Sequence, residues 1–487
     1  MTAPPTPPSR LPEADVPRWD AEADLVVVGF GAAGSAAAIA GREAGASVIV
    51  LEKSPDATES ASAQAGGHFY LGGGTAVQKA CGFEDSADAM YRYLEALCPE
   101  PEPAKLRLYA DGSVEHFDWL ERQGMIFERT YFPHKSPLQE GTECLIWTGN
   151  EKVWPFRDKA KPAPRGHKVA MAGNGGPLVM RVLSAAAERA GAAIRYGAGV
   201  TNLVVDAASR VIGVRAEQNV VPLFVRAQKG VVLAAGGYIR NRAMVQQHVP
   251  WLPDDLILQG GPWDDGMGVM LGQSVGGATQ RMDKAFVTSP FYPPADMLKG
   301  ILVNKTGERF VAEDCYHGRT AGISLDQPDG IVYLILDQPI FGTPPYDFFE
   351  QHVVAKADTL AGIESALRLP GGSLQQAVRR YNEHAARGED PEFHKYGEWV
   401  RPLDTPPFYA YDLSKGRAKY SGFSLGGLRT SVDCQVLNSA GGAIAGLFAA
   451  GATALNIAQD SRGYSSGTCL GESSFFGRRA GRLAVQS

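Results

Sequence analysis

Cysteine is scarce in this sequence, and no group of cysteines or histidines has the spacing of a metal site. The 487 residues include six cysteines and nine histidines, scattered along the chain. No C-x-x-C pair and no H-E-x-x-H motif occurs among them, which excludes the usual spacings of zinc sites, iron–sulfur clusters and disulfide frameworks. We therefore expect a protein that folds without disulfide bonds and without a metal centre.

Long apolar runs and an excess of positive charge are also missing. No stretch of about 18 consecutive apolar residues occurs, so we predict no membrane-spanning helix. The 47 Lys and Arg residues and the 53 Asp and Glu residues give a net charge of −6, whereas nucleic-acid-binding proteins usually carry a basic excess. The proline-rich residues 1–20 lack the basic and apolar regions of a secretion signal. We expect them to form a flexible tail on a cytoplasmic protein that has no nucleic-acid partner.

Glycine, in contrast, is abundant. The chain has 57 glycines, about 12% of its residues against roughly 7% in average proteins. They occur in short clusters without a fixed repeat, which is typical of places where the backbone approaches a large ligand closely. The length predicts two or three domains, and the 44% hydrophobic and 21% charged residues are typical of a globular chain.

The first glycine cluster lies between a predicted strand and a predicted helix. The apolar residues 25–28 predict a buried strand, a G-x-G-x-x-G motif follows at residues 29–34, and the alanine-rich residues 36–43 predict a helix. A second apolar strand, residues 47–51, ends at Glu52. Strand, glycines, helix, strand and acidic residue in this order are typical of a Rossmann-type dinucleotide-binding unit. We therefore predict an α/β fold.

Each residue of this motif has a physical role in dinucleotide binding. Gly29 allows the tight turn, Gly31 lets the pyrophosphate approach the backbone, and Gly34 lets the helix pack against the sheet. The N-terminus of the helix offers free N–H groups and a positive dipole end to the phosphates. Glu52 can accept hydrogen bonds from ribose hydroxyls. The motif alone is compatible with either NAD(P) or FAD.

The loop after the second strand favours FAD. Residues 58–75 are rich in Ser, Ala and Gly, a composition that suits a chain passing close to a large planar cofactor. With this loop, the sequence resembles the flavoprotein subunits of fumarate reductase and succinate dehydrogenase, together with the 3-ketosteroid dehydrogenases. The resemblance runs in order from about residue 22 to the end of the chain. Its further segments are residues 201–217, 232–241, 305–314, 445–453 and 471–481.

The resemblance implies a Rossmann-type FAD-binding domain interrupted by an inserted α+β substrate domain. We place the FAD-binding domain at residues 21–280 and 421–487 and the substrate domain at residues 281–420. Covalent members attach FAD to a histidine before a Gly-Gly pair, where this chain has Glu59 or Ser60, so we expect non-covalent FAD. The residues assigned to FAD binding are Gly29, Gly31, Ala33, Gly34, Glu52, Lys53, Ser60, Ser62, Ala65, Gly66, Gly67, Ala235, Gly236, Gly451, Ser466 and Leu470.

The resemblance also indicates the kind of substrate. Family members that handle dicarboxylates need cationic side chains, because a dianion removed from water must be charge-paired. At the corresponding positions this chain has Phe423 in place of a histidine and Tyr464 in place of an arginine. A third cationic position falls at or beside Tyr316, with Arg319 close by. The resemblance therefore argues against a small diacid and favours a large apolar ketone.

Among the ketosteroid enzymes, residues 460–474 (DSRGYSSGTCLGESS) and Tyr316 look most like 3-ketosteroid Δ4-(5α)-dehydrogenase. That resemblance implies oxidation of a 5α-3-ketosteroid to its 4-ene, with proton abstraction at C4 and hydride transfer from C5 to flavin N5. Tyr464 is the predicted base region, and Ser466 and Tyr316 are predicted relay or orienting groups. The backbone N–H groups of Gly467 and Thr468 are the predicted donors to the C3 carbonyl.

Two other interpretations stay open from the sequence. A Δ1-ketosteroid dehydrogenase, or a flavin-dependent reductase of an enone or another activated alkene, would use the same fold. A non-catalytic FAD-binding electron-transfer protein belongs to another class, and Tyr464 and Ser466 argue against it because a carrier needs no acid–base group. The sequence identifies neither the side chain of the steroid, nor the electron acceptor, nor the oligomeric state, nor which of the three side chains takes the proton first.

Overall fold

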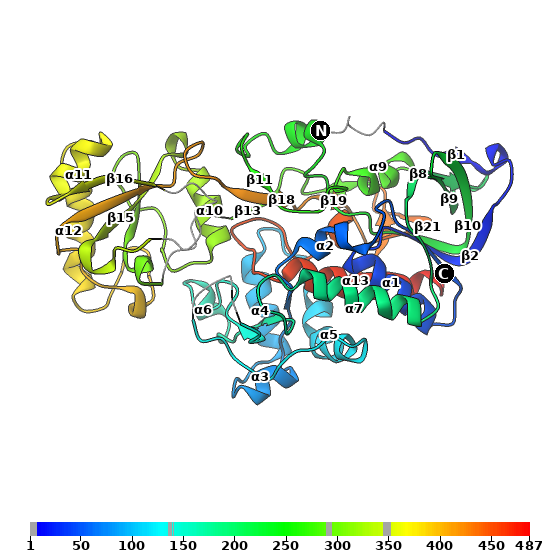
Figure 1. Ribbon diagram of the computed structural model, residues 1–487, viewed down its shortest axis with the longest axis horizontal. Helices are drawn as coiled ribbons and strands as arrows, with labels where there is room; N and C mark the ends of the chain where they lie inside the picture. Colours follow the sequence, from blue (N-terminus) through cyan, green and yellow to red (C-terminus); the bar gives the residue numbers. More distant parts are fainter. Residues whose placement is uncertain (1–6, 135–138, 140, 289–294, 344–351) are drawn as a thin grey trace.

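The computed structural model describes residues 7–134, 139, 141–288, 295–343 and 352–487. Within these ranges the chain forms a larger lobe, at the right of Figure 1, and a smaller lobe, at the left. Both lobes combine sheets with helices, so the predicted α/β class is confirmed.

A nine-stranded sheet forms the centre of the larger lobe. Its strands follow the order β1-β8-β9-β10-β2-β3-β7, with β21 also paired to β10, and β20 to β21. Strands β3, β2, β10 and β21 run parallel, whereas β8, β9 and β10 form an antiparallel meander. The bounds are β1 (Leu11–Pro12), β2 (Ala21–Val28), β3 (Val48–Leu51), β7 (Ala193–Arg195), β8 (Ala198–Val205), β9 (Val211–Gln218), β10 (Val221–Leu233), β20 (Gln435–Leu437) and β21 (Ala443–Ala449).

The strand–helix–strand unit predicted from the glycine motif is confirmed. The two predicted strands correspond to the end of β2 and to β3, which pair in parallel. The predicted helix is α1 (Ala32–Glu43), which begins earlier than residue 36 because Gly31 is its N-cap. Alanine and glycine make up most of α1, and these small residues let α13 (Thr468–Ala484) cross it closely: a Cβ at Gly477 would lie 2.3 Å from the Ala33 carbonyl oxygen.

Helices cover one face of the sheet. Figure 1 shows α1, α7 (Gly176–Arg189) and α13 side by side on this face. Beyond them lies a further layer, made of a small sheet and short or amphipathic helices. Its members are β4 (His68–Tyr70), β5 (Leu145–Ile146), β6 (Gly166–Lys168), α3 (Ala76–Ala80), α4 (Ala87–Leu97), α5 (Pro103–Arg122) and α6 (Phe156–Lys159). The short helix α2 (Ala61–Gln64) packs against α7 instead.

The smaller lobe is built on an antiparallel sheet of order β14-β15-β17-β16. A buried ion network supports it: Arg309 contacts Glu313 at 3.0 Å and Asp390 at 2.9 Å, and Lys395 contacts Glu313 at 3.2 Å. Because each charge is paired, the network is compatible with its burial. The elements are β14 (Ile301–Asn304), β15 (Val332–Asp337), β16 (His352–Ala357), β17 (Phe408–Asp412), α10 (His317–Leu325), α11 (Leu360–Leu367) and α12 (Ser373–Ala385).

Two antiparallel strands, β13 (Ala285–Thr288) and β18 (Ser421–Ser424), run between the lobes. Strand β18 also pairs with β11 (Ile257–Leu258). Near these strands lie α8 (Arg242–His248), α9 (Met267–Ser274) and the paired strands β12 (Thr279–Gln280) and β19 (Gly427–Leu428). The predicted boundaries at residues 281 and 421 fall beside β13 and β18, and the division into an FAD-binding and a substrate domain stays a prediction.

Part of the predicted N-terminal tail lies along the sheet. Leu11 and Pro12 form β1, which pairs in parallel with Val204 and Val205 of β8. The side chain of Asn202 donates to the Ser9 carbonyl oxygen at 2.8 Å. Residues 7–20 are therefore attached to the larger lobe, and residues 1–6 lie outside the described part of the chain. None of the helices in the described ranges combines the length and the apolar character that a membrane crossing requires.

Candidate active site

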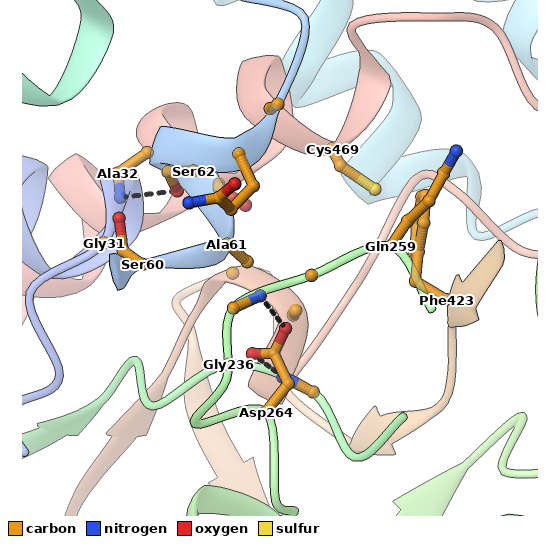
Figure 2. Close-up of a pocket in the computed structure, with 18 of the residues that line it drawn as sticks. Gly31, Ala32, Ser60, Ala61, Ser62, Gly236, Gln259, Asp264, Phe423 and Cys469 are labelled. Carbon is orange, nitrogen blue, oxygen red and sulfur yellow. Dashed lines mark hydrogen bonds between the residues drawn. The ribbon is translucent and has the colours of Figure 1, made fainter. Parts of the chain in front are cut away.

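A cavity of about 730 Å³ extends from the glycine motif of the larger lobe to the aromatic side chains next to the smaller lobe. Its size is in the usual range for pockets that hold small molecules or cofactors. Its walls come from distant parts of the chain, including the β2–α1 turn, the loop after β3, the turn after β10 and the start of α13. Figure 2 shows part of this wall, with Gly31, Ala32 and residues 60–62 on one side and Phe423, Gln259 and Cys469 on the other.

The glycine motif forms one end of the cavity. Gly29 has a φ of 95°, and a Cβ there would lie 2.4 Å from the Ala234 carbonyl oxygen, so the turn requires glycine. The N–H of Ala32 donates to the Ser62 Oγ at 3.0 Å, which joins the start of α1 to the loop after β3 (Figure 2). The first turn of α1 lines the cavity. The N–H groups of a first helical turn have no hydrogen-bond partner within the helix, so they can bind a ligand there.

Glu52 lies at the end of β3, at the wall of the same cavity. Its carboxylate is buried and accepts hydrogen bonds from the N–H groups of Phe30 at 2.6 Å and Ser54 at 2.8 Å. Each carboxylate oxygen can accept more than one hydrogen bond, so Glu52 retains the capacity to bind hydroxyl groups in the cavity. The arrangement fits the role predicted for this residue.

Most of the predicted FAD-binding residues line this one cavity. Two do not: Gly34 packs against the β2–α1 turn, where a Cβ would lie 2.0 Å from the Gly29 carbonyl oxygen, and Gly67 packs against Gly175. These two glycines support the wall from behind. The predicted residues that line the cavity are Gly29, Gly31, Ala33, Glu52, Lys53, Ser60, Ser62, Ala65, Gly66, Ala235, Gly236, Gly451, Ser466 and Leu470.

Asp264 is a cavity residue that the sequence analysis missed. One of its carboxylate oxygens accepts the N–H of Gly261 at 3.0 Å, and the other accepts the N–H of Gly237 at 3.3 Å (Figure 2). The carboxylate thus holds together two glycine-rich turns of the wall. Burial nevertheless raises the pKa of Asp264 to about 6.

The raised pKa of Asp264 predicts a pH dependence of stability. The folded FAD-free protein favours the protonated carboxyl, so this group's contribution is greatest below the unfolded pKa and is lost as the pH rises through about 6. In urea unfolding of the apoprotein, the free energy of unfolding of wild type should fall by about 2 kcal/mol relative to that of Asp264→Asn between about pH 4 and pH 7. A difference that stays constant over this range would contradict the assignment.

Aromatic side chains form the other end of the cavity. The ring centroid of Tyr464 lies 4.4 Å from that of Phe286, 5.9 Å from that of Phe423 and 6.3 Å from that of Tyr316. The Tyr464 hydroxyl accepts the N–H of Cys469 at 3.4 Å, and burial raises the pKa of Tyr464 well above that of a free tyrosine. The two predicted catalytic tyrosines, which are far apart in the sequence, are therefore brought together at one wall.

Arg319, the cationic residue near Tyr316 in the sequence, does not reach the aromatic end of the cavity. Arg319 lies outside the cavity as the described residues delimit it. Its guanidinium lies 5.2 Å from the ring centroid of Phe156 and donates to the Arg462 carbonyl oxygen. The residues that face the cavity here are Tyr316 and His317.

The turn before α13 lies between the two ends. Ser466 and Gly467 line the cavity, and Gly467, with a φ of 94°, precedes the first residue of α13. The N–H of Thr468 instead donates to the Ser465 carbonyl oxygen at 3.1 Å, and Thr468 is buried behind the wall. Of the two predicted donors to the substrate carbonyl, Gly467 therefore lies at the cavity wall and Thr468 lies behind it.

Residues 24–468 match the FAD binding domain family. The solved structure of 3-ketosteroid-Δ4-(5α)-dehydrogenase from Rhodococcus jostii RHA1, in complex with 4-androstene-3,17-dione, is similar with a TM-score of 0.93 and 39% identity, covering 99% of this chain and 100% of that one. The 3-oxo-5-alpha-steroid 4-dehydrogenase of Comamonas testosteroni is 29% identical over 90% of this chain and 94% of its own. A 3-ketosteroid Δ1-dehydrogenase structure from Sterolibacterium denitrificans shares the fold, with a TM-score of 0.73 and 20% identity over 96% of this chain and 99% of that one.

Proposed function

The chain belongs to the FAD binding domain family, and from this membership we propose that it is an FAD-dependent 3-oxosteroid dehydrogenase that converts a 5α-3-ketosteroid to its 4-ene. The observation that carries the proposal is the aromatic, cation-poor end of the cavity, formed by Tyr316, Phe423, Tyr464 and Phe286. The 39% identity and TM-score of 0.93 to a Δ4-(5α)-dehydrogenase bound to a steroid support it.

The residues present fit FAD. The first turn of α1 can bind the pyrophosphate, the Glu52 carboxylate can bind ribose hydroxyls, and the walls between Gly66, Ala235 and Leu470 can hold the flavin. At residues 59 and 60, Glu59 and Ser60 offer no histidine for a covalent link, so we propose non-covalent binding. When bound, FAD supplies a hydride acceptor, N5 of its ring system.

The aromatic end fits a neutral apolar substrate. A diacid beside Tyr316, Phe423 and Tyr464 would lose its water without gaining a cationic partner from these three positions, which is energetically costly. The side chains of Phe286 and Phe423 instead offer apolar contact area, and the hydroxyls of Tyr316 and Tyr464 offer polar groups at a dry wall. A ketosteroid combines a large apolar body with a ketone end that can accept hydrogen bonds from such a wall.

A group of this wall must accept the proton that leaves C4. Because the pKa of Tyr464 is raised, its hydroxyl is protonated in neutral solution and can accept a proton only if it passes its own on. We propose that Tyr316 and Ser466, which line the same cavity, receive or orient that proton. The N–H of Gly467 and the positive dipole end of α13 stabilise the negative charge that develops on the C3 oxygen.

The proposed function gives the two predicted domains the roles expected from the sequence, FAD binding and substrate binding. Residues 21–280 and 421–487 would bind FAD, and residues 281–420 would contribute Tyr316 and close the substrate end. We also retain the prediction of a cytoplasmic protein, whose electron acceptor is still to be identified.

Two steroids distinguish this proposal from the Δ1 alternative. We expect 5α-androstane-3,17-dione to be oxidised in the presence of an artificial electron acceptor, and 4-androstene-3,17-dione to remain unchanged, because it already contains the double bond that the enzyme forms. A Δ1-dehydrogenase would oxidise 4-androstene-3,17-dione to a 1,4-diene. Oxidation of that steroid, or of succinate, would contradict the proposal.

A further inference from the structure

The segment of residues 148–150 lies directly behind the wall that carries the predicted catalytic groups. It follows β5 and precedes α6, and it does not belong to any motif that identified the FAD site. Its residues do not line the cavity. Thr148 and Asn150 are buried, and Asn150 has no exposed surface.

This segment binds the backbone of two predicted catalytic residues. The carbonyl oxygen of Thr148 accepts the N–H of Ser466 at 2.8 Å. The side-chain oxygen of Asn150 accepts the N–H of Tyr316 at 2.9 Å. Ser466 belongs to the predicted FAD-binding domain and Tyr316 to the predicted substrate domain, so one short segment holds a residue from each.

A second link reaches the same place through Tyr93. The Tyr93 hydroxyl accepts the N–H of Asn150 at 2.8 Å and forms a hydrogen bond with the Ser465 Oγ at 2.9 Å. The residue between the two anchors is a glycine for a steric reason: a Cβ at Gly149 would lie 2.2 Å from the Ser465 Oγ and 2.6 Å from the Tyr93 hydroxyl oxygen. The backbone of the segment therefore packs directly against residues 465 and 466.

The chain just after this segment contacts the smaller lobe. The ring centroid of Trp154 lies 4.4 Å from that of His394, and the guanidinium of Arg157 lies 5.6 Å from the ring centroid of Tyr396. These contacts place residues 148–157 against both lobes. The segment is thus suited to fix the distance between Tyr316 on one lobe and Ser466 on the other.

We propose that Asn150 is a positioning residue for the proposed dehydrogenation. It fixes the position of the Tyr316 backbone relative to Ser466 and Tyr464. The inference rests on the proposed function, because it assigns Asn150 to the proton-transfer step of that reaction. Asn150 touches neither the cavity nor a reacting atom. Its effect should therefore appear in the rate of the chemical step and not in the binding of FAD or steroid.

The test compares Asn150→Ala with wild type in anaerobic single-turnover reduction by 5α-androstane-3,17-dione. We expect the limiting rate of flavin reduction to fall on the order of tenfold to a hundredfold, because a small displacement of a catalytic group can cost that much. The steroid Kd should change by less than about threefold and the flavin spectrum should be unchanged, since neither binding site is touched. Tyr93→Phe removes the second link without changing the ring, and it should also lower the limiting rate of flavin reduction. If Asn150→Ala does not fold, the limiting rate of Tyr93→Phe tests the inference in its place.

Asn382→Ala is the matched control. The Asn382 side chain accepts the N–H of Leu403 at 2.9 Å, so this variant also removes an asparagine bond to a backbone amide, at a place away from the cavity. We expect it to lower the melting temperature and to leave the limiting rate unchanged. An Asn150→Ala enzyme that folds and reduces its flavin at the wild-type rate would overturn the inference about Asn150 but not the proposed function. A wild-type flavin that the steroid does not reduce would overturn the proposed function, and with it the role of Asn150.

Discussion

Gly31→Val should give a folded protein without bound FAD. A Cβ at Gly31 would have Ser62 Oγ at 3.2 Å and Ser60 Cβ at 3.9 Å as its nearest neighbours, and the backbone there has an ordinary φ of −72°, so the fold can accept a side chain with a small adjustment. The branched side chain would fill the space in front of the first turn of α1, where the phosphates must approach the N–H groups. We expect FAD affinity to fall by at least about 10²-fold.

The measurement is the flavin absorbance per mole of purified protein, with circular dichroism to check folding. Gly371→Val is the matched control, since no atom lies within 4 Å of a Cβ built there and the residue is exposed, away from the cavity. Gly29→Val would be a poor test, because its positive φ and its contact with Ala234 would disturb the fold itself. A fully yellow Gly31→Val protein would show that the motif does not bind the cofactor.

Tyr464→Phe should retain FAD and lose most of its activity. The substitution keeps the ring contacts with Phe286 and Phe423 and removes only the hydroxyl, which accepts the N–H of Cys469 at 3.4 Å and also interacts with the Cys469 side chain. If this hydroxyl takes part in proton removal from C4, the limiting rate of flavin reduction should fall by about 10²-fold or more. Stopped-flow reduction by the steroid, with the flavin content measured in parallel, provides the test.

Tyr411→Phe is the control for the loss of a buried tyrosine hydroxyl. Tyr411 is buried in β17 of the smaller lobe and donates to the Gly342 carbonyl oxygen at 2.8 Å. We expect this variant to be less stable by about 1 kcal/mol and to keep its rate. Near-normal turnover of Tyr464→Phe would remove Tyr464 from the mechanism and would leave Tyr316 and Ser466 as the groups to examine.

The sequence was most informative where function depends on residues that are close together in the chain. The β2–α1–β3 unit follows from local patterns: an apolar run, glycines at a turn, and an alanine-rich helix. Its residues Gly31 and Glu52 lie at the cavity wall. Even there the start of α1 was placed too late, because the N-cap at Gly31 is itself part of the glycine motif.

The remaining features depend on contacts between segments that are far apart in the chain. The bond from Asp264 to Gly237 joins residues 27 positions apart, and the bond from Asn150 to Tyr316 joins residues 166 positions apart. No periodicity or motif marks such pairs. The sequence also does not show which N–H groups of a turn remain free: the N–H of Thr468 is bound within its own turn by the Ser465 carbonyl oxygen.

The central claim is that the cavity holds FAD at one end and oxidises a 5α-3-ketosteroid at the other. The most direct test is to mix the purified holoprotein anaerobically with 5α-androstane-3,17-dione, to follow the flavin absorbance and to identify the steroid product. We predict bleaching of the flavin and formation of one 4-ene per flavin reduced. Bleaching with a 1-ene product would contradict the assignment of C4 and C5, and a bound flavin that stays oxidised would contradict the steroid substrate itself.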